Sequence, residues 1–529
     1  MPPRPAVPRH LTAALFALAA ASPLAHADPP RAHRNRPARA HAAPRARPAP
    51  PAAPPSPPEA PAAPPPDPLA ASLDEAARAA EADPRVRRRP PLPDPAAMLP
   101  AMRVERFSLP NGLDVVLSPE AEGRQVVVGV EYRVGTGDCP PARASLAHLA
   151  EHLTYGPTRH APDGLLVEVE RADATVFNGI TSVDRTRYFA AAPAGSLERL
   201  LWIEGERMAF SLDAVTDGSV GHERSVVANE YRQRVADSPA GDLDLAVARE
   251  LYPEGHLRRA PHHTADEIAA VTPADVRAFL RAWYVPANAR LTVTGRFDPA
   301  RARAWVQRYF GDIPAAPAPR RERGLEPPRL TQERVLRYRA PQASEGVEVH
   351  WATPALHAPG DAELDVVAEL TGRSQAGSLE RALVGAGVAT RVYVRQHSHD
   401  DTSEFVISAT AAAGHSAEEV LDIIDRELVQ LRRAEPARAE VVGAVARIRR
   451  ALVERTASLL ERAWQAGTRP DPDDPGHLRG ALALYAAVTP GAVRRAAARW
   501  LPLDRRLVVI LQGDPRAPAS GVVESVRSR

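Results

Sequence analysis

Lysine is absent from this sequence of 529 residues, and cysteine occurs only once, at Cys139. Without lysine the chain can form neither a Schiff base nor a Ser–Lys dyad, and it lacks the side chain that P-loop nucleotidases require. A single cysteine excludes an internal disulfide and any metal site built from several thiolates. The chemistry must therefore rest on histidine, carboxylate, hydroxyl and arginine side chains.

The chain also has little net charge and few long apolar runs. The 67 basic residues, all arginine, nearly balance 65 acidic ones, which gives a formal net charge of +2. Composition therefore gives no argument for general binding to nucleic acid or membranes. Beyond the first 27 residues, no apolar run approaches the ~20 residues that a spanning helix needs. With 44% hydrophobic residues, the chain is long enough for two or three domains with substantial cores.

The first 27 residues are typical of a secretory signal peptide. Arg4 and Arg9 make a basic start, Leu11 to Leu24 is an apolar run, and Ala25-His26-Ala27 is a small-x-small cleavage site. We therefore expect export to a bacterial periplasm or beyond. The alternative interpretation is a disordered, alanine-rich tail.

Residues 28–100 are rich in proline and alanine and carry several arginines. Such a segment buries too little apolar area to offset the entropy of ordering, so we predict an extended, disordered linker. Its arginines could touch an anionic envelope surface, and an envelope-interaction protein that works through this tail is one functional hypothesis. A solvated linker is the simpler interpretation.

The strongest chemical signal is His148-Leu149-Ala150-Glu151-His152. Two histidines four residues apart lie on one face of a helix, and Glu151 shares that face. Two converging imidazoles can hold Zn²⁺, and a carboxylate beside them can take a proton from metal-bound water. H-x-x-E-H is the inverzincin signature. The alternative is a pair of ordinary histidines on a helix, so the surrounding sequence has to decide.

Strands and helices flank this motif. A helix is predicted over residues 221–234, and Glu223 and Glu230 lie two turns apart on it, so both carboxylates face one way. Glu230 is a plausible third metal ligand, with Glu223 behind it as a supporting carboxylate. Another helix is predicted over residues 197–208. Alternating and turn-bounded apolar residues predict strands over residues 104–109, 113–117, 126–134, 173–179 and 187–191.

The chain also repeats itself. Residues 269–277 recur as residues 486–494, Trp283 corresponds to Trp500, and the strand at residues 291–295 corresponds to that at residues 507–511. Helix, turn and strand agree in order and spacing, which predicts two homologous halves. We place the first domain at residues 101–317, a linker at residues 318–329 and the second domain at residues 330–520. The second half has no H-x-x-E-H.

From residue 102 to residue 515 the sequence resembles the pitrilysin-type zinc peptidases, the M16 family, of the bacterial two-domain type. The motifs that carry the resemblance occur in the same order along the chain. They are Leu109-Pro110-Asn111-Gly112-Leu113, the H-x-x-E-H helix, Tyr155-Gly156-Pro157-Thr158, Asn178 with Thr181, Glu206-Arg207-Met208, Glu223 with Glu230, Tyr284-Val285-Pro286-Ala287-Asn288, and Tyr309 to Pro314.

The resemblance implies a fold and a set of roles. The fold is α+β, with two homologous domains, each a mixed β-sheet with packed helices, that form half of a clamshell chamber. Zn²⁺ is bound by His148, His152 and Glu230. Glu151 is the general base that activates zinc-bound water, and Glu223 supports the catalytic site. Substrate-binding roles are implied for Asn178, at a strand edge that pairs with an extended peptide, and for Tyr155.

The resemblance also implies a function and partners. The function is an exported zinc metalloendopeptidase that hydrolyses extended or unfolded peptides, acting as a homo-oligomer or as a heterodimer with a second M16-like subunit. Relatives of this size carry an Arg and a Tyr in the second half that hold substrate, and Val384 and Thr390 stand at those positions here. This departure favours the metal-bearing subunit of a heterodimer. The alternative is a non-catalytic chamber subunit or peptide-binding protein.

Overall fold

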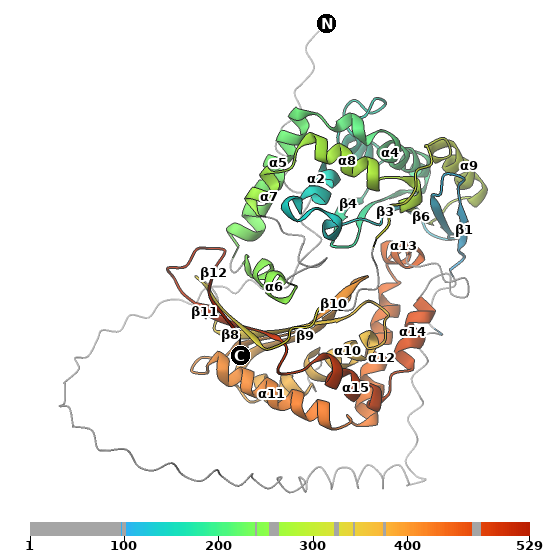
Figure 1. Ribbon diagram of the computed structural model, residues 1–529. Helices are drawn as coiled ribbons and strands as arrows, with labels where there is room; N and C mark the ends of the chain where they lie inside the picture. Colours follow the sequence, from blue (N-terminus) through green and yellow to red (C-terminus); the bar gives the residue numbers. More distant parts are fainter. Residues whose placement is uncertain are drawn as a thin grey trace, which may run out of the picture. The chain divides into compact units, whose positions relative to one another are not determined.

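The two sequence repeats fold into two six-stranded sheets, each flanked by helices (Figure 1). The computed structural model describes Ala97 and residues 102–528, apart from residues 239–240, 253–263, 322–326, 342–343, 374–376 and 468–477. All of these described residues fall within one compact unit. The predicted signal peptide, the predicted linker of residues 28–100 except Ala97, and part of the segment 318–329 lie outside the described residues.

The first sheet is mixed, because β2 and β6 run parallel whereas the other neighbouring strands are antiparallel. Apolar residues alternate along its strands, so that one face is buried under helices. In spatial order its strands are β1 (Glu105–Ser108), β2 (Asp114–Pro119), β6 (Ala289–Gly295), β3 (Gln125–Tyr132), β5 (Thr186–Pro193) and β4 (Val176–Thr181).

The second sheet has the same plan, with the parallel pair formed by β7 and β11. In spatial order its strands are β12 (Val522–Ser528), β7 (Arg334–Ala340), β11 (Leu507–Gly513), β8 (Gly346–Pro354), β10 (Thr402–Ala411) and β9 (Ala389–His397). The predicted α+β fold with two homologous halves is therefore confirmed. The outer strand β12 lies beyond residue 520, where we had ended the second domain.

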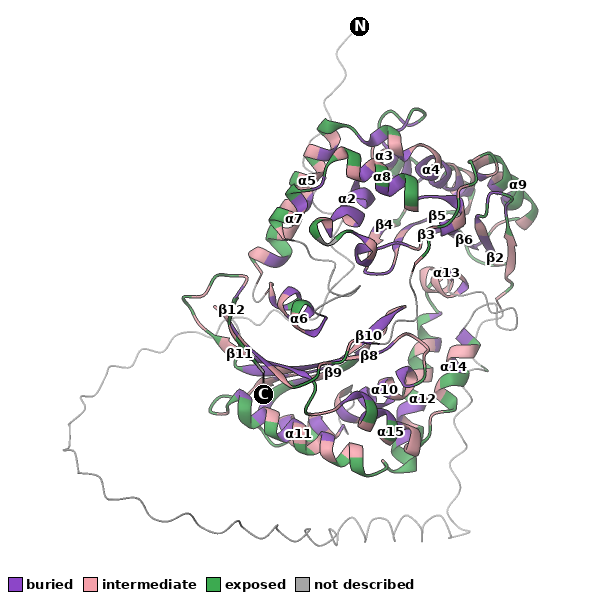
Figure 2. Cartoon of the chain, in the orientation of Figure 1, coloured by how far each residue is buried: buried purple, intermediate pink, exposed green. Residues whose placement is uncertain are grey.

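Helices flank each sheet, most of them on one face, and Figure 2 shows many of them buried toward the strands and exposed on the other side. In the first half they are α2 (Leu146–Leu153), α3 (Leu165–Arg171), α4 (Leu197–Phe210), α5 (Asp217–Tyr231), α6 (Leu243–Leu251), α7 (Ala265–Ala269), α8 (Pro273–Trp283) and α9 (Pro299–Phe310). In the second half they are α10 (Asp361–Ala368), α11 (Ala417–Arg433), α12 (Arg438–Arg455), α13 (Leu459–Gly467), α14 (Leu478–Ala486) and α15 (Pro490–Trp500). Among the described residues, no helix has both the length and the apolarity needed to cross a membrane.

The repeated segment is built in the same way in both halves. Thr272 caps α8 by accepting a hydrogen bond from the N–H of Asp275, and Thr489 caps α15 through the N–H of Ala492. In both helices a proline occupies the first turn, where its missing N–H costs nothing. The shared Val-Thr-Pro sequence is therefore a helix start.

Each half also contributes a helix to the other sheet. Helix α6 of the first half packs Leu243, Val247 and Leu251 against Leu507 and Val509 of β11. Helix α13 of the second half packs against β6 and β3, and its Trp464 ring lies edge-on to Phe189 of β5 with centroids 5.2 Å apart. This exchange of helices ties the two halves together with buried apolar contacts.

Candidate metal centre

Helix α2 positions the H-x-x-E-H motif. Leu146, Leu149 and Leu153 bury one side of the helix in the core of the first half, which turns His148 and His152 toward α5. The Nε2 atoms of the two histidines lie 3.3 Å apart. The predicted convergence of the two imidazoles is therefore present.

The single cysteine supports the start of this helix. Cys139 is buried, and its Sγ accepts a hydrogen bond from the N–H of Ala147 at 3.3 Å. The first turn of a helix has N–H groups without intrahelical partners, so the thiol satisfies one of them. Cys139 thus helps to fix the helix that carries the histidines.

Helix α5 brings the third candidate ligand. It begins at Asp217, earlier than predicted, because Thr216 and Ser219 form a capping box. Glu230 lies near its end, and its Oε2 is 3.7 Å from His148 Nε2 and 3.6 Å from His152 Nε2. Ligands at about 2.1 Å from a tetrahedral zinc lie about 3.4 Å from one another. The three atoms therefore fit a zinc ion, and among the described residues they form the single such cluster.

Two further contacts orient these ligands. The Nδ1 of His152 lies 3.2 Å from Glu223 Oε2, so that a proton on Nδ1 is held there and Nε2 presents its lone pair to the metal position. Arg234, in the turn after α5, pairs with Glu230 Oε1 at 2.6 Å and leaves Oε2 for the metal. Glu223, predicted to support the catalytic site, contacts His152, and its role stays a prediction.

The charges in the site also suit a cation. Burial lowers the pKa of His152, but the nearby carboxylates of Glu223 and Glu230 outweigh it and raise the pKa to about 10. Burial likewise raises the pKa of Glu230, yet His152, His148 and Arg234 bring it down to about 2. A metal ion must displace the proton from His152, so its binding tightens as pH rises.

We expect Glu223→Ala to weaken zinc binding by about 10- to 100-fold, because His152 loses the partner that fixes its tautomer and ring orientation. Competition with a chromophoric chelator measures the affinity. Glu223→Gln, which keeps a hydrogen-bond acceptor, should lose less. An unchanged affinity in Glu223→Ala would show that the 3.2 Å contact does not orient the ligand.

The predicted base is held beneath strand β4. Glu151 is only 2% exposed, and its Oε2 accepts a 2.6 Å hydrogen bond from Thr181 Oγ1. Gly179 lies directly over the same carboxylate, and a Cβ at that position would overlap it. The strand backbone therefore approaches Glu151 closely, and a larger side chain at this position would have to displace the carboxylate.

Burial raises the pKa of Glu151, while His152 and the Thr181 hydrogen bond oppose that rise. Thr181→Val removes one opposing contribution and should raise the pKa further. Since the base works deprotonated, the acidic limb of the kcat/KM profile is then expected to move to higher pH. Thr175→Val, at an exposed position just before β4, is the matched control. An acidic limb that does not move would contradict the role of Thr181.

Asn178 and Tyr155, the two predicted substrate contacts, lie in different settings. β4 is an edge strand, so the backbone beside Asn178 is available to an added strand. The side chain of Asn178 is on the opposite face of the sheet from Gly179 and Thr181, because strand residues alternate. Tyr155 is 8% exposed and lies under Arg207, 4.4 Å from its guanidinium carbon. The ring therefore contributes to the core, and its contact with substrate stays a prediction.

Arg207 anchors the floor of the site. It is 1% exposed, pairs with Glu204 at 3.0 Å and donates to the carbonyl of Thr154 at 2.8 Å, just after α2. Arg207→Leu leaves the buried Glu204 carboxylate unpaired, so we expect the free energy of unfolding to fall by about 3–5 kcal/mol. Urea unfolding measures this loss. Adding Glu204→Leu should recover part of it, and a double variant that is no more stable would contradict the pairing.

Sequence reasoning did not assign Thr181, Gly179 or Arg234 to the site. Alternation along β4 could have placed Gly179 and Thr181 on one face, but not that face against Glu151. Neither residue at the positions expected for Arg and Tyr has a side chain that could replace a guanidinium or a phenol. Val384 is half-buried, and Thr390 is exposed on β9, where it donates to the carbonyl of Thr410.

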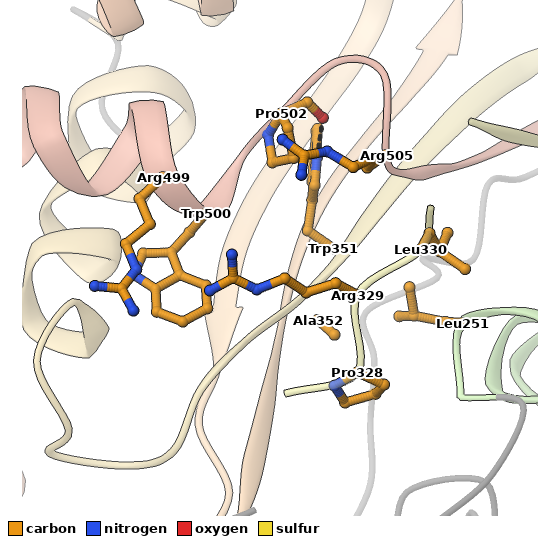
Figure 3. A pocket seen from close by; sticks show the side chains of 10 residues that line it. All are labelled: Leu251, Pro328, Arg329, Leu330, Trp351, Ala352, Arg499, Trp500, Pro502 and Arg505. Carbon is orange, nitrogen blue, oxygen red and sulfur yellow. Dashed lines mark hydrogen bonds between the residues drawn. The ribbon is translucent and has the colours of Figure 1, made fainter. Parts of the chain in front are cut away.

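A separate pocket in the described part of the chain has about 380 Å³ of empty space (Figure 3). The guanidinium carbons of Arg329 and Arg499 lie 4.9 Å and 4.7 Å from the Trp500 ring centroid. None of the residues that line it belongs to the metal centre. They are Leu251, Pro328, Arg329, Leu330, Trp351, Ala352, Arg499, Trp500, Pro502 and Arg505.

Comparisons with known proteins agree with the geometry. Residues 270–448 match the model of the Peptidase M16 inactive domain, a stretch that begins after the last predicted metal ligand. Zinc protease PqqE of Helicobacter pylori is 27% identical over 349 residues, which cover 64% of this chain and 76% of that protein. Probable zinc protease PqqL of Escherichia coli is 25% identical over 367 residues, or 63% of this chain and 39% of that protein.

The same fold occurs in a solved structure. The crystal structure of a protease from Helicobacter pylori matches with a TM-score of 0.71 and 23% identity, covering 78% of this chain and all of that one (100%). The two-sheet arrangement of the described residues is therefore shared with that structure.

Proposed function

Because this chain belongs to the M16 family of zinc metallopeptidases, we propose that it is itself a zinc metalloendopeptidase that hydrolyses extended peptides. The observation that carries the proposal is the convergence of His148, His152 and Glu230 beside the buried carboxylate of Glu151. All four residues needed for the chemistry are present, on two helices that the core holds in place.

Each residue has a distinct task. Zinc, when bound, supplies a Lewis acid that polarises the peptide carbonyl and acidifies a coordinated water. His148, His152 and Glu230 would hold the ion, and Glu223 and Arg234 orient two of these residues. Glu151 accepts the proton of the attacking water and then donates it to the leaving amine. Thr181 holds the carboxylate so that it faces the reacting atoms.

Substrate is expected to bind along β4. Its outer edge has no partner among the described strands, so an extended peptide can add to the sheet through backbone hydrogen bonds. Gly179 and Thr181 of this strand lie against Glu151, so the added peptide passes close to the base. A folded protein presents no such free strand, which favours unfolded or extended substrates enclosed between the two halves.

We also propose that the chain is exported and works with a partner. Export rests on the first 27 residues, and a pairing with a second M16-like subunit rests on Val384 and Thr390 at the positions expected to hold substrate. A partner with an Arg and a Tyr at those positions would complete the site. Purification as a monomer or homodimer with full activity would contradict the heterodimer.

The test is hydrolysis of a mixed library of unstructured peptides by the purified full chain, with the same sequences embedded in a folded protein as the comparison. Cleavage of the free peptides alone supports the proposal. Zinc binding without cleavage, even after a candidate partner is added, would favour a peptide-binding or chamber subunit instead. Removing residues 28–98 without loss of turnover would exclude the tail as the working part.

A further inference from the structure

The edge strand of the second sheet carries an unusual row of side chains. β9 pairs only with β10 among the described strands, so its outer edge is free. Val392 and Val394 point into the core of the second half. Arg391, Tyr393 and Arg395 alternate with them on the other face, where both arginines are exposed and Tyr393 is half-buried. We call these three residues the β9 basic row.

The positive charge of this row is not neutralised. Among the described residues, no carboxylate lies within ion-pair distance of Arg391 or Arg395, and the one hydrogen bond of the row runs from Arg395 to the Tyr393 hydroxyl at 3.2 Å. His397, the next residue on this face, adds no charge at neutral pH. Burial and then Arg395 lower its pKa to about 4.

The carboxylates nearest to the row on this face are already engaged. His350 lies between Glu404, 2.5 Å from its Nδ1, and Glu348, 3.3 Å from its Nε2. The carboxylates of Glu348 and Glu404 raise the pKa of His350 to about 10, against the effect of burial, so the ring carries a proton that lies between the two carboxylates. Both carboxylates are thus paired with His350 and not with Arg391 or Arg395.

The strand that carries the row is connected through contacting turns to β4, the strand beside the metal centre. Thr181, which holds Glu151, ends β4, and His397 ends β9. The turns that follow these strands touch each other: Arg185 forms an ion pair with Asp400, and the N–H of Asp400 donates to Asp184 Oδ2 at 3.1 Å. The turns that follow the two edge strands therefore meet at one junction between the halves.

Strand geometry gives the distance from the end of β9 to each arginine of the row. At ~3.3 Å per residue, Arg395 lies about 7 Å and Arg391 about 20 Å back along β9 from His397. An extended peptide covers the same distance per residue, so about six residues reach from His397 to Arg391. Charges on edge strands commonly guard against aggregation, but this row lies on a strand whose end contacts the turn after β4.

We propose that the β9 basic row binds acidic segments of peptide substrates, so that acidic peptides are preferred. The inference rests on the proposed peptidase function. Guanidinium groups recognise carboxylates through paired N–H donors, and the free strand edge can bind the peptide backbone at the same time. The second half, which lacks the H-x-x-E-H motif, thereby contributes to the choice of substrate and not to the chemical step.

Binding to the full chain, made inactive by Glu151→Gln, tests this directly. The probes are a fluorescent peptide with a run of glutamates and its partner with glutamine at each of those positions. We expect the glutamate peptide to bind about three- to tenfold more tightly at low salt, and the difference to shrink as salt rises. Arg391→Gln with Arg395→Gln should abolish the preference and leave the affinity for the glutamine peptide unchanged.

Arg426→Gln, at an exposed position on α11 that covers the opposite face of the sheet, is the matched control and should retain the preference. Equal binding of the two peptides, no binding of either, or a preference that survives in the double variant would each overturn the inference. If the preference depends on the row but the wild-type chain cleaves neither peptide, the binding site stands and the peptidase proposal fails.

Discussion

Glu151→Gln is expected to lower kcat/KM for peptide hydrolysis by about 10²- to 10⁴-fold and to leave zinc binding intact. The substitution keeps the shape of the side chain and an oxygen that can accept the Thr181 hydrogen bond, but an amide cannot take the proton of the attacking water. Zinc should remain because its ligand atoms belong to His148, His152 and Glu230. Peptide kinetics and metal analysis on the same sample measure both effects.

The matched control is Glu170→Gln, an exposed glutamate on α3 that should leave both activity and zinc unchanged. Two results would contradict the account. Substantial residual activity in Glu151→Gln would mean that another group acts as the base. Loss of zinc together with activity would mean that Glu151 belongs to the ligand set instead.

His148→Ala is expected to remove both bound zinc and activity. His148 is one of three ligands, and the loss of a direct ligand should exceed the roughly 10- to 100-fold expected when a supporting residue is removed. The side chain is about one-fifth exposed, at 20%, so the fold should tolerate the change. Zinc titration and circular dichroism separate loss of metal from loss of structure.

His415→Ala serves as its control, because His415 pairs with Glu419 in the second half, away from the metal centre. That variant should bind zinc like the unmodified chain. Tight zinc binding by His148→Ala would show that the ion is held elsewhere. The two helices would then not form the zinc site.

Much of the site was accessible from the sequence because its spacing is helical. His148, Glu151 and His152 share a face of one helix, and Glu223 and Glu230 share a face of another, so each set follows from periodicity alone. Thr181 contacts Glu151 across 30 residues of sequence, through the packing of α2 on a sheet edge. No local pattern encodes that contact.

The setting of Tyr155 could not be predicted in the same way. It follows the metal motif closely in sequence, and the family resemblance implied a role in substrate binding. Its ring is instead buried against Arg207 and Tyr188, because the residue after the helix turns inward to the core. Adjacency to a catalytic motif does not determine which way a side chain points.

The fold was predictable where the halves repeat and not where they differ. The matched helix and strand at Thr272 and Thr489 gave two homologous domains. The outer strand breaks the repeat: β1 comes from the start of the first half, whereas β12 comes from the end of the chain. The exchange of α6 and α13 between the halves is a tertiary contact with no signature in the local sequence.

Zinc re-addition to the full chain tests the central claim most directly. The purified protein is stripped with a chelator, and peptide hydrolysis is then followed as zinc is added in steps, with bound metal measured in each sample. We predict that stripping abolishes hydrolysis and that activity returns in proportion to bound zinc up to about one ion per chain. Hydrolysis that survives complete removal of the metal, or a chain that takes up no zinc at all, would contradict the account.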